Sequence, residues 1–191
     1  MMSEVVGSRD EVYGMLARLF IGPPDEELLE SILGYEVDVD TERLAVDFTE
    51  LLRGIRRSSP PPPYESLYRE GVIHGETTQE VMEAYHAFGV HPSGDLEGEP
   101  ADHISLELDF MRHLVTLEAD AGTAEELMRI LRAEGEFLDG HLCQWVGGLS
   151  QRIEDHDDTG FYSSVATFTD AWVTDDLRRV QERLGAGEVA P

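Results

Sequence analysis

The chain has 191 residues, of which 41% are hydrophobic, so it is long enough to bury one sizeable core. Forty Asp and Glu residues oppose fourteen basic residues, all of them arginine, and the formal net charge is -26. This balance excludes nucleic acid and anionic membrane as partners, because both require clustered basic residues. The excess of carboxylates without lysine is typical of proteins adapted to a salt-rich cytoplasm, where a screening length of ~3 Å near 1 M salt relieves self-repulsion.

The sequence shows neither the apolar core of a signal peptide nor the run of ~18 apolar residues that spans a bilayer. We therefore expect a cytoplasmic protein without stable membrane insertion. The single cysteine, Cys143, has no partner for an intramolecular disulfide and lacks the companions of a zinc site.

Three amphipathic helices are predicted in the first third of the chain. The first begins at Asp10, where apolar side chains start to recur at helical spacing, and Gly22, Pro23 and Pro24 end it. Asp25 is placed to cap the second helix, and Asp40 or Thr41 is placed to cap the third. A proline-rich spacer, residues 58–63, ends this pattern because consecutive prolines supply no backbone donors to a helix.

The segment after the spacer, YESLYREGVIHGETT, is predicted to be an irregular connector, because Gly71 and Gly75 interrupt any continuous helix through it. A helix capped by Thr77 or Thr78 follows, and a polar loop, residues 91–99, comes next.

Three longer helical patterns complete the chain: residues 100–121, residues 123–153 with a break near Gly147 and Gly148, and residues 161–184. Residues 185–191 are predicted to form a disordered tail. Strand alternation is nowhere sustained, so we predict an all-α fold, with residues 1–191 forming a single-domain helical bundle.

The segment EPADHISLELDFM, residues 99–111, opens the first of these three helices. Pro100 suits a first helical turn, and Glu99 or Asp102 is placed to receive the free backbone amides. His103 and Glu107 lie four residues apart, so they share one face of the helix. From spacing alone, a capping aspartate beside a solvated His/Glu pair is favoured over a functional site.

A calcium loop is rejected for DHDDTG, residues 155–160, because Ala166 stands where the loop requires a bidentate glutamate. Asp158 or Thr159 as the cap of the last helix is the better interpretation. No Gly-rich phosphate loop occurs in the sequence.

A nucleophile with its base is rejected for His141 and Cys143, because residues two apart on a helix point in different directions. His103 and Glu107 supply two ligands for a metal-dependent hydrolase, which stays open as a remote alternative, although no second histidine stands at ligand spacing.

Several segments, in order, resemble the TorD/DmsD family of cytoplasmic chaperones for molybdopterin-containing oxidoreductases. EPADHISLELDFM resembles the family's Glu-Pro-x-Asp-His signature. PPYESLYREG, followed by GETTQEVMEAYHAFGV, resembles its Pro-Tyr-Glu-Ser-x-Tyr segment and the helix after it. FLDGHLCQWVGGL resembles the later Phe-Leu-x-x-His-Leu-x-x-Trp segment, and GFYSSVA resembles the start of the last long helix. The resemblance covers about residues 10 to 183.

The resemblance implies an all-helical chaperone that is not an enzyme and has no cofactor or metal of its own. Its partners would be the twin-arginine signal peptide and the apo catalytic subunit of a DMSO or TMAO reductase type of molybdopterin oxidoreductase. The chaperone would hold this client back from export and assist cofactor insertion, as a monomer or homodimer. An alternative with the same fold is a NarJ-like nitrate reductase assembly chaperone.

The resemblance also implies an exposed peptide groove between the connector and the helix that starts near Pro100. The matching positions are Pro63, Tyr64, Glu65, Ser66, Tyr68, Gly75, Asp102, His103 and Glu107. Carboxylates at the rim would pair with two guanidinium groups, and aromatic walls would cover the apolar stretch that follows them. Tyr85 and Phe88 are further candidate walls, although their helical spacing with Val81 favours plain core packing.

Overall fold

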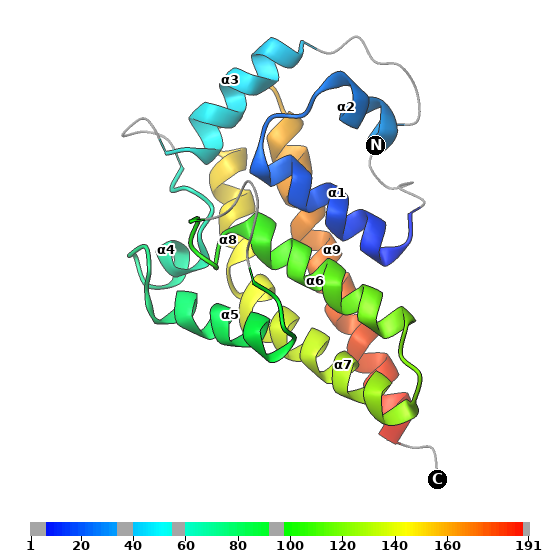
Figure 1. Ribbon diagram of the computed structural model, residues 1–191. Coiled ribbons are helices and arrows are strands. Elements are labelled where there is room, and N and C mark those ends of the chain that lie inside the picture. The colour runs from blue at the N-terminus through cyan, green and yellow to red at the C-terminus, as the bar shows by residue number, and fades with distance from the viewer. Residues whose placement is uncertain (1–6, 34–39, 55–59, 92–97, 189–191) are drawn as a thin grey trace.

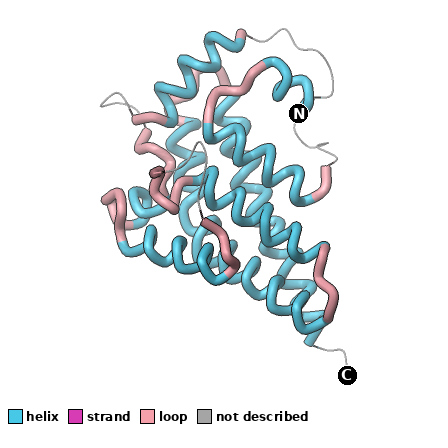
Figure 2. Tube along the Cα trace, in the orientation of Figure 1, coloured by secondary structure: helices cyan, strands magenta, loops and turns pink. Residues whose placement is uncertain are grey.

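The computed structural model describes residues 7–33, 40–54, 60–91 and 98–188. Within these ranges every regular element is helical (Figure 2), which confirms the predicted all-α class. The elements are α1 (Arg9–Ile21), α2 (Glu26–Leu33), α3 (Thr41–Leu52), α4 (Glu65–Arg69), α5 (Glu76–Ala87), α6 (Ile104–Ala119), α7 (Ala124–Phe137), the π-helical turn η2 (Leu138–Leu142), α8 (Cys143–Glu154) and α9 (Phe161–Glu188).

Helix α6 lies at the centre of the bundle, with α1 packed along it and α7 in contact with it (Figure 1). The long helix α9 contacts α1, α3, α7 and α8. The short helix α4 touches both α5 and α8, so the connector is held against the bundle. This arrangement places the N-terminal end of α6, which we call its mouth, between the connector and the second half of the chain.

One connected apolar core joins residues from α1 to α9. Helix α1 buries Val12, Leu16 and Phe20, which recur at helical spacing on one face. Helix α6 buries most residues of its first three turns, because α1 and α7 pack against it and the connector pairs with its start. Burying one large apolar side chain stabilises a fold by about 1.5–3 kcal/mol, so this core opposes the self-repulsion of the acidic surface.

Two helix starts follow from local sequence, as predicted. Leu28 N donates to Asp25 Oδ1 at 2.8 Å, and Arg43 N donates to Asp40 Oδ1 at 2.9 Å. Each such cap contributes about 1 kcal/mol to helix stability. Residues 55–59, which include the start of the proline-rich spacer, and residues 92–97 of the predicted loop lie outside the described residues.

The helix break predicted near Gly147 and Gly148 is wrong. Helix α8 passes through both glycines, and the π-helical turn η2 interrupts the α-helical pattern earlier. A Cβ atom at Gly148 would lie 3.7 Å from the ring of Tyr68, and one at Gly147 would lie 3.3 Å from Asp170. These glycines therefore mark close approaches of neighbouring segments rather than the end of a helix.

The start and the end of α9 also differ from the prediction. Asp157, rather than Asp158 or Thr159, caps the helix, because its Oδ2 accepts from Ser163 N at 2.8 Å. Helix α9 then continues to Glu188, four residues beyond the predicted helix end at residue 184. Extending an existing helix orders only one residue per added hydrogen bond, which allows it to continue beyond its packed part. Residues 189–191 lie outside the described residues.

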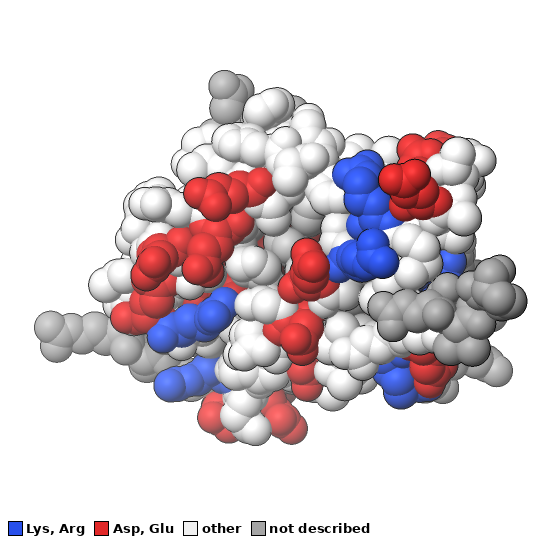
Figure 3. Space-filling view, turned by 90° about the horizontal axis from the view of Figure 1, so that it is seen from below, with Lys and Arg blue, Asp and Glu red and all other residues white. Residues whose placement is uncertain are grey.

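Charged side chains of both signs are interspersed on the face seen from below, where arginines lie among the carboxylates (Figure 3). Among the helices that the structure describes, none is both long and apolar enough to cross a membrane.

Candidate functional site

The connector and the mouth of α6 meet, as the motif positions predicted. An isolated antiparallel bridge pairs Tyr64 with His103. Two backbone hydrogen bonds hold this bridge, one from Ile104 N to Pro63 O at 3.0 Å and one from Glu65 N to Asp102 O at 2.9 Å. We call this contact the α4–α6 junction, defined by residues 63–66 and 102–104.

Asp102 caps the neighbouring helix instead of its own. Its Oδ2 accepts from Ser66 N of α4 at 2.8 Å, whereas His103 Nδ1 accepts from Ser105 N of α6 at 3.2 Å. Burial lowers the pKa of His103 to about 4, so the ring is neutral near pH 7 and its Nδ1 is able to accept. The prediction that Glu99 or Asp102 caps the α6 helix is therefore wrong, because tertiary packing brings α4 to Asp102.

Glu65 is a buried carboxylate that ties the junction to η2. Its Oε1 accepts from Arg69 at 2.5 Å, and its Oε2 lies 2.9 Å from His141 Nδ1. The Arg69 guanidinium also donates to the Gly140 carbonyl at 3.0 Å. Glu65 therefore contacts a residue, His141, that lies 76 positions further along the chain.

Glu107 is the second buried carboxyl group beside the junction. Its Oε2 accepts from Trp145 Nε1 of α8 at 3.1 Å. Burial, followed by the negative charge of Glu65, raises the pKa of Glu107 well above its ordinary value. The raised pKa favours the protonated form of Glu107, and the carboxyl proton of this form is able to donate to the neighbouring Glu65 carboxylate.

The prediction that these side chains line an exposed groove is wrong. Glu65, Ser66, Asp102 and Glu107 are 0% exposed, and His103 is 4% exposed. The reason is that the connector pairs with the start of α6 while α1, α7 and Trp145 of α8 contact its first turns. The predicted residues do come together, but as a polar core beneath the surface.

Tyr64 and Tyr68 are only partly buried, so they are the parts of the predicted site nearest to solvent. Tyr64 OH donates to Glu99 Oε2 at 2.6 Å, and its ring lies edge-on to His103 with centroids 5.2 Å apart. The ring of Tyr68 packs against Trp145 with centroids 5.4 Å apart. Together with Glu99, Tyr64 forms a polar and aromatic rim above the buried carboxylates.

Gly75 has a structural role at the start of α5. The Glu70 carboxylate accepts from Glu76 N at 2.9 Å and from Thr77 N at 2.8 Å, so it caps the helix from outside. The prediction that Thr77 or Thr78 caps this helix is wrong, since both lie inside its first turn. A Cβ atom at Gly75 would collide with the Glu70 carboxylate, so the cap requires glycine at this position.

Replacing Gly75 by alanine is expected to displace the Glu70 carboxylate and to lower the melting temperature by about 2–4 °C. Hydrogen bonding to Thr77 lowers the pKa of Glu70, and in the variant this pKa should return toward its ordinary value. NMR titration of Glu70 measures this directly. Gly140→Ala is the matched control, because nothing lies within 4 Å of a Cβ atom there. An unchanged Glu70 titration in Gly75→Ala would contradict the proposed capping.

Tyr85 and Phe88, the two further residues predicted as possible groove walls, differ in their burial. Tyr85 is buried in the core, and its OH donates to the Ala101 carbonyl at 2.9 Å, so packing is its role. Phe88 is partly exposed beside Phe110, with ring centroids 6.2 Å apart. Phe88 therefore remains available as part of a surface.

Sequence reasoning missed two functional neighbours, His141 and Trp145. Both lie in the segment FLDGHLCQWVGGL, which carries the family resemblance, and they are four residues apart. That spacing places them on one face of a helix, where they contact Glu65 and Glu107 respectively. The motif is the signal in the sequence that could have identified them. Their partners, Glu65 and Glu107, become apparent only in the folded structure.

A metal centre receives no support from the described residues, among which no group of three His, Cys, Asp or Glu side chains could hold a metal ion. His103 and Glu107 take different partners, Ser105 N and Trp145 respectively. For Cys143, burial raises the pKa of the thiol to about 11, which keeps it protonated near neutral pH.

Comparisons with known proteins assign this helical chain to a family. A family model described as the nitrate reductase delta subunit matches residues 23–151, which is more than half of the chain. The chain therefore belongs to the nitrate reductase delta subunit family.

The similar proteins confirm the resemblance to TorD-type chaperones. The chaperone protein TorD of Vibrio cholerae serotype O1 is 31% identical over 142 residues, covering 74% of this chain and 64% of the relative. TorD of Photobacterium profundum is 28% identical over 163 residues, covering 81% and 74%. The alignment thus spans less than two thirds of the length of the Vibrio cholerae protein. Both relatives are named as chaperones.

A solved structure shares the fold. A crystal structure from Archaeoglobus fulgidus, assigned to a redox enzyme maturation protein, matches with a TM-score of 0.60 and 25% sequence identity. The match covers 88% of this chain and 95% of that chain. The helical arrangement described above is therefore that of a known fold.

Proposed function

We propose that this protein is a cytoplasmic chaperone that binds the twin-arginine signal peptide of a molybdopterin oxidoreductase catalytic subunit and assists cofactor insertion before export. Its relatives named TorD and the redox enzyme maturation neighbour support this proposal. The observation that carries it is the convergence of three motif segments, represented by Tyr64, His103 and His141, at the α4–α6 junction.

In this proposal the buried carboxylates act indirectly. Glu65, Asp102 and Glu107 hold the connector, the mouth of α6 and η2 together, and the peptide contacts the rim formed by Tyr64 and Glu99. A guanidinium group pairs more strongly with a carboxylate than a neutral donor does, because the hydrogen bond is charge-assisted. The net charge of -26 accelerates encounter with a basic peptide at low salt.

Isothermal titration calorimetry with a synthetic twin-arginine leader peptide is expected to show one binding site. Replacing both peptide arginines by lysine should weaken binding, because lysine cannot pair bidentately with a carboxylate. Glu99→Gln in the protein should weaken binding about tenfold, which equals about 1.4 kcal/mol. Glu154→Gln is the matched control, since Glu154 is an exposed glutamate at the end of α8.

Two results would contradict this proposal in different ways. If the protein binds the intact apo catalytic subunit but not the leader peptide, the chaperone stands and signal-peptide recognition is wrong. If it binds neither, the chaperone function itself is wrong. If Glu99→Gln and Glu154→Gln bind the peptide with equal affinity, the rim does not contact the peptide.

A further inference from the structure

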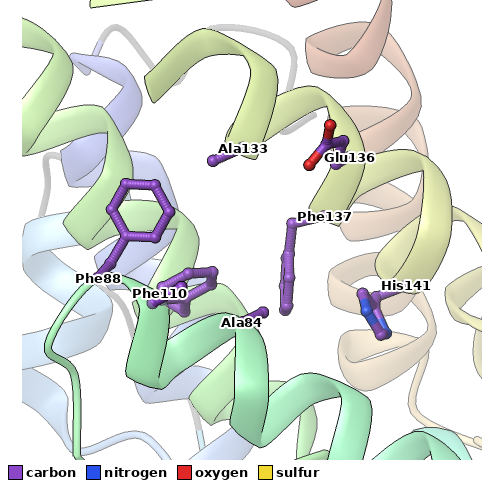
Figure 4. Close-up of a pocket in the computed structure, with 8 residues that line it drawn as sticks. Ala84, Phe88, Phe110, Ala133, Glu136, Phe137 and His141 are labelled. Atoms are coloured by element: carbon purple, nitrogen blue, oxygen red, sulfur yellow. The ribbon is translucent and has the colours of Figure 1, made fainter. Parts of the chain in front are cut away.

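A shallow apolar hollow opens on the surface where α5, α6 and α7 meet (Figure 4). Its volume is about 230 Å³. Three phenylalanines, Phe88, Phe110 and Phe137, form its walls together with three alanines, Glu136 and His141. We call this feature the aromatic hollow.

The hollow exists because alanines stand where larger side chains would fill the space. Ala84 from α5 and Ala133 from α7 face it, and Ala87 of α5 also lines it. The rings of Phe110 and Phe137 meet edge-on at 4.8 Å, so their positions are fixed by packing. An apolar cavity of about 150 Å³ holds a benzene ring, so the aromatic hollow has room for one aromatic or branched apolar side chain.

The rim of the hollow is acidic along α5. This helix exposes Glu80 and Glu83 and contains no lysine or arginine. Glu80 lies four residues before Ala84, and Glu83 lies four residues before Ala87, so each shares a face with a lining alanine. Glu136 adds a further carboxylate from α7. The surface therefore complements an apolar side chain that has cationic neighbours.

The α7 side of the hollow carries basic residues as well, since the exposed Arg132 lies four residues before Glu136 and shares its face of the helix. The guanidinium of Arg129 lies over the ring of Phe88, 4.7 Å from its centroid. The acidic character is therefore concentrated along α5, which exposes Glu80 and Glu83 and has no arginine or lysine. We therefore expect a cationic group of a partner on the α5 side of the hollow.

The hollow is coupled to the α4–α6 junction through His141. The imidazole ring of His141 lines the hollow and packs on Phe137 with centroids 4.8 Å apart. Its Nδ1 faces Glu65 at 2.9 Å, so one side chain belongs to both features. A ligand in the hollow therefore touches a group that holds the connector in place.

We propose that the aromatic hollow receives one large apolar side chain of the bound leader peptide, while the glutamates of α5 and Glu136 pair with one of the adjacent arginines and Glu99 at the rim pairs with the other. This inference rests on the proposed function, since it assigns a subsite for the same peptide. Apolar burial supplies affinity that persists at high salt, whereas the carboxylates set the orientation of the peptide.

Filling the hollow tests the inference without removing any existing contact. Ala133→Leu should weaken binding of the leader peptide at least tenfold, and Ala171→Leu, at an exposed position of α9, should leave it unchanged. A peptide whose large apolar residue beside the arginines is replaced by alanine should bind wild type about as weakly. Combining this peptide with Ala133→Leu should add little further loss, because both changes remove one interaction.

A second measurement addresses the hollow without the peptide. Titration with toluene should shift the NMR methyl signals of Ala84 and Ala133 in wild type but not the signal of Ala171. Thermal unfolding of Ala133→Leu confirms that this variant is folded.

The outcomes separate this inference from the proposed function. If wild type and Ala133→Leu bind the leader peptide equally, the subsite is wrong and the proposed function stands. If wild type does not bind the peptide, both fail, even where toluene enters the hollow. Methyl signals that do not respond to toluene would also overturn the assignment of an apolar subsite.

Discussion

Replacing Arg9 by alanine is expected to lower the free energy of unfolding by about 3–5 kcal/mol, because it leaves buried carboxylates without their cation. The guanidinium of Arg9 donates twice to Asp176, both at 2.8 Å, and once to Glu134 at 2.6 Å, and it also pairs with Glu118. The side chains of Glu134 and Asp176 are 0% exposed. Urea unfolding monitored by circular dichroism measures the loss.

The loss should depend on pH. Burial raises the pKa of Glu134 to about 7, above its ordinary value of 4.5. A raised folded-state pKa gives stability that is fully present below the unfolded value and is lost as pH rises toward the folded value. Arg9 opposes this shift, so without it Glu134 holds its proton more tightly. We therefore expect the variant to lose more stability near pH 8 than near pH 5.

Arg178→Ala is the control for Arg9→Ala. Arg178 pairs with Asp175 and Glu182, but its own side chain is 60% exposed. Exposed ion pairs contribute little, so this control should leave the urea midpoint nearly unchanged. If Arg9→Ala were no more destabilising than Arg178→Ala, the buried cluster would have to be solvated, contrary to its packing.

Replacing Glu107 by alanine is expected to lower the free energy of unfolding by about 2–4 kcal/mol, since it leaves a cavity and an unpaired Trp145 N–H in the core. Glu107→Gln should change it by less than about 1 kcal/mol near pH 7. The amide oxygen keeps the hydrogen bond from Trp145, and the amide NH₂ replaces the carboxyl proton toward Glu65. Asp109→Ala, an exposed position on the same helix, is the control and should have little effect.

Glu107→Gln should also flatten the dependence of stability on pH. Because the folded-state pKa of Glu107 is raised, its contribution to stability is complete below about pH 4.5 and is lost as pH rises through the folded value. Glutamine does not titrate, so the variant should gain stability relative to wild type at alkaline pH. Urea midpoints from pH 5 to pH 9 provide the comparison. Parallel curves for the two proteins would show that Glu107 is ionised in the folded state.

The sequence by itself determined the features that depend on residues close together in the chain. Helical spacing and the missing strand alternation predicted the all-α class. Asp25 and Asp40 cap their helices through contacts three residues away, which spacing alone identifies. The motif segments also predicted that Tyr64 and His103 belong to one site, and the two residues pair in the structure.

Tertiary structure decided which of these side chains are exposed and which partners they take. Helical spacing gives Glu107 the same position on α6 whether that face is exposed or covered. The packing of other elements against α6 buries Glu107 and thereby raises its pKa. Asp102 caps α4, and Glu70 caps α5 from outside, because the folded chain brings distant backbone amides to these carboxylates. Periodicity describes the face on which a side chain lies, whereas burial and pairing depend on the segments that cover that face.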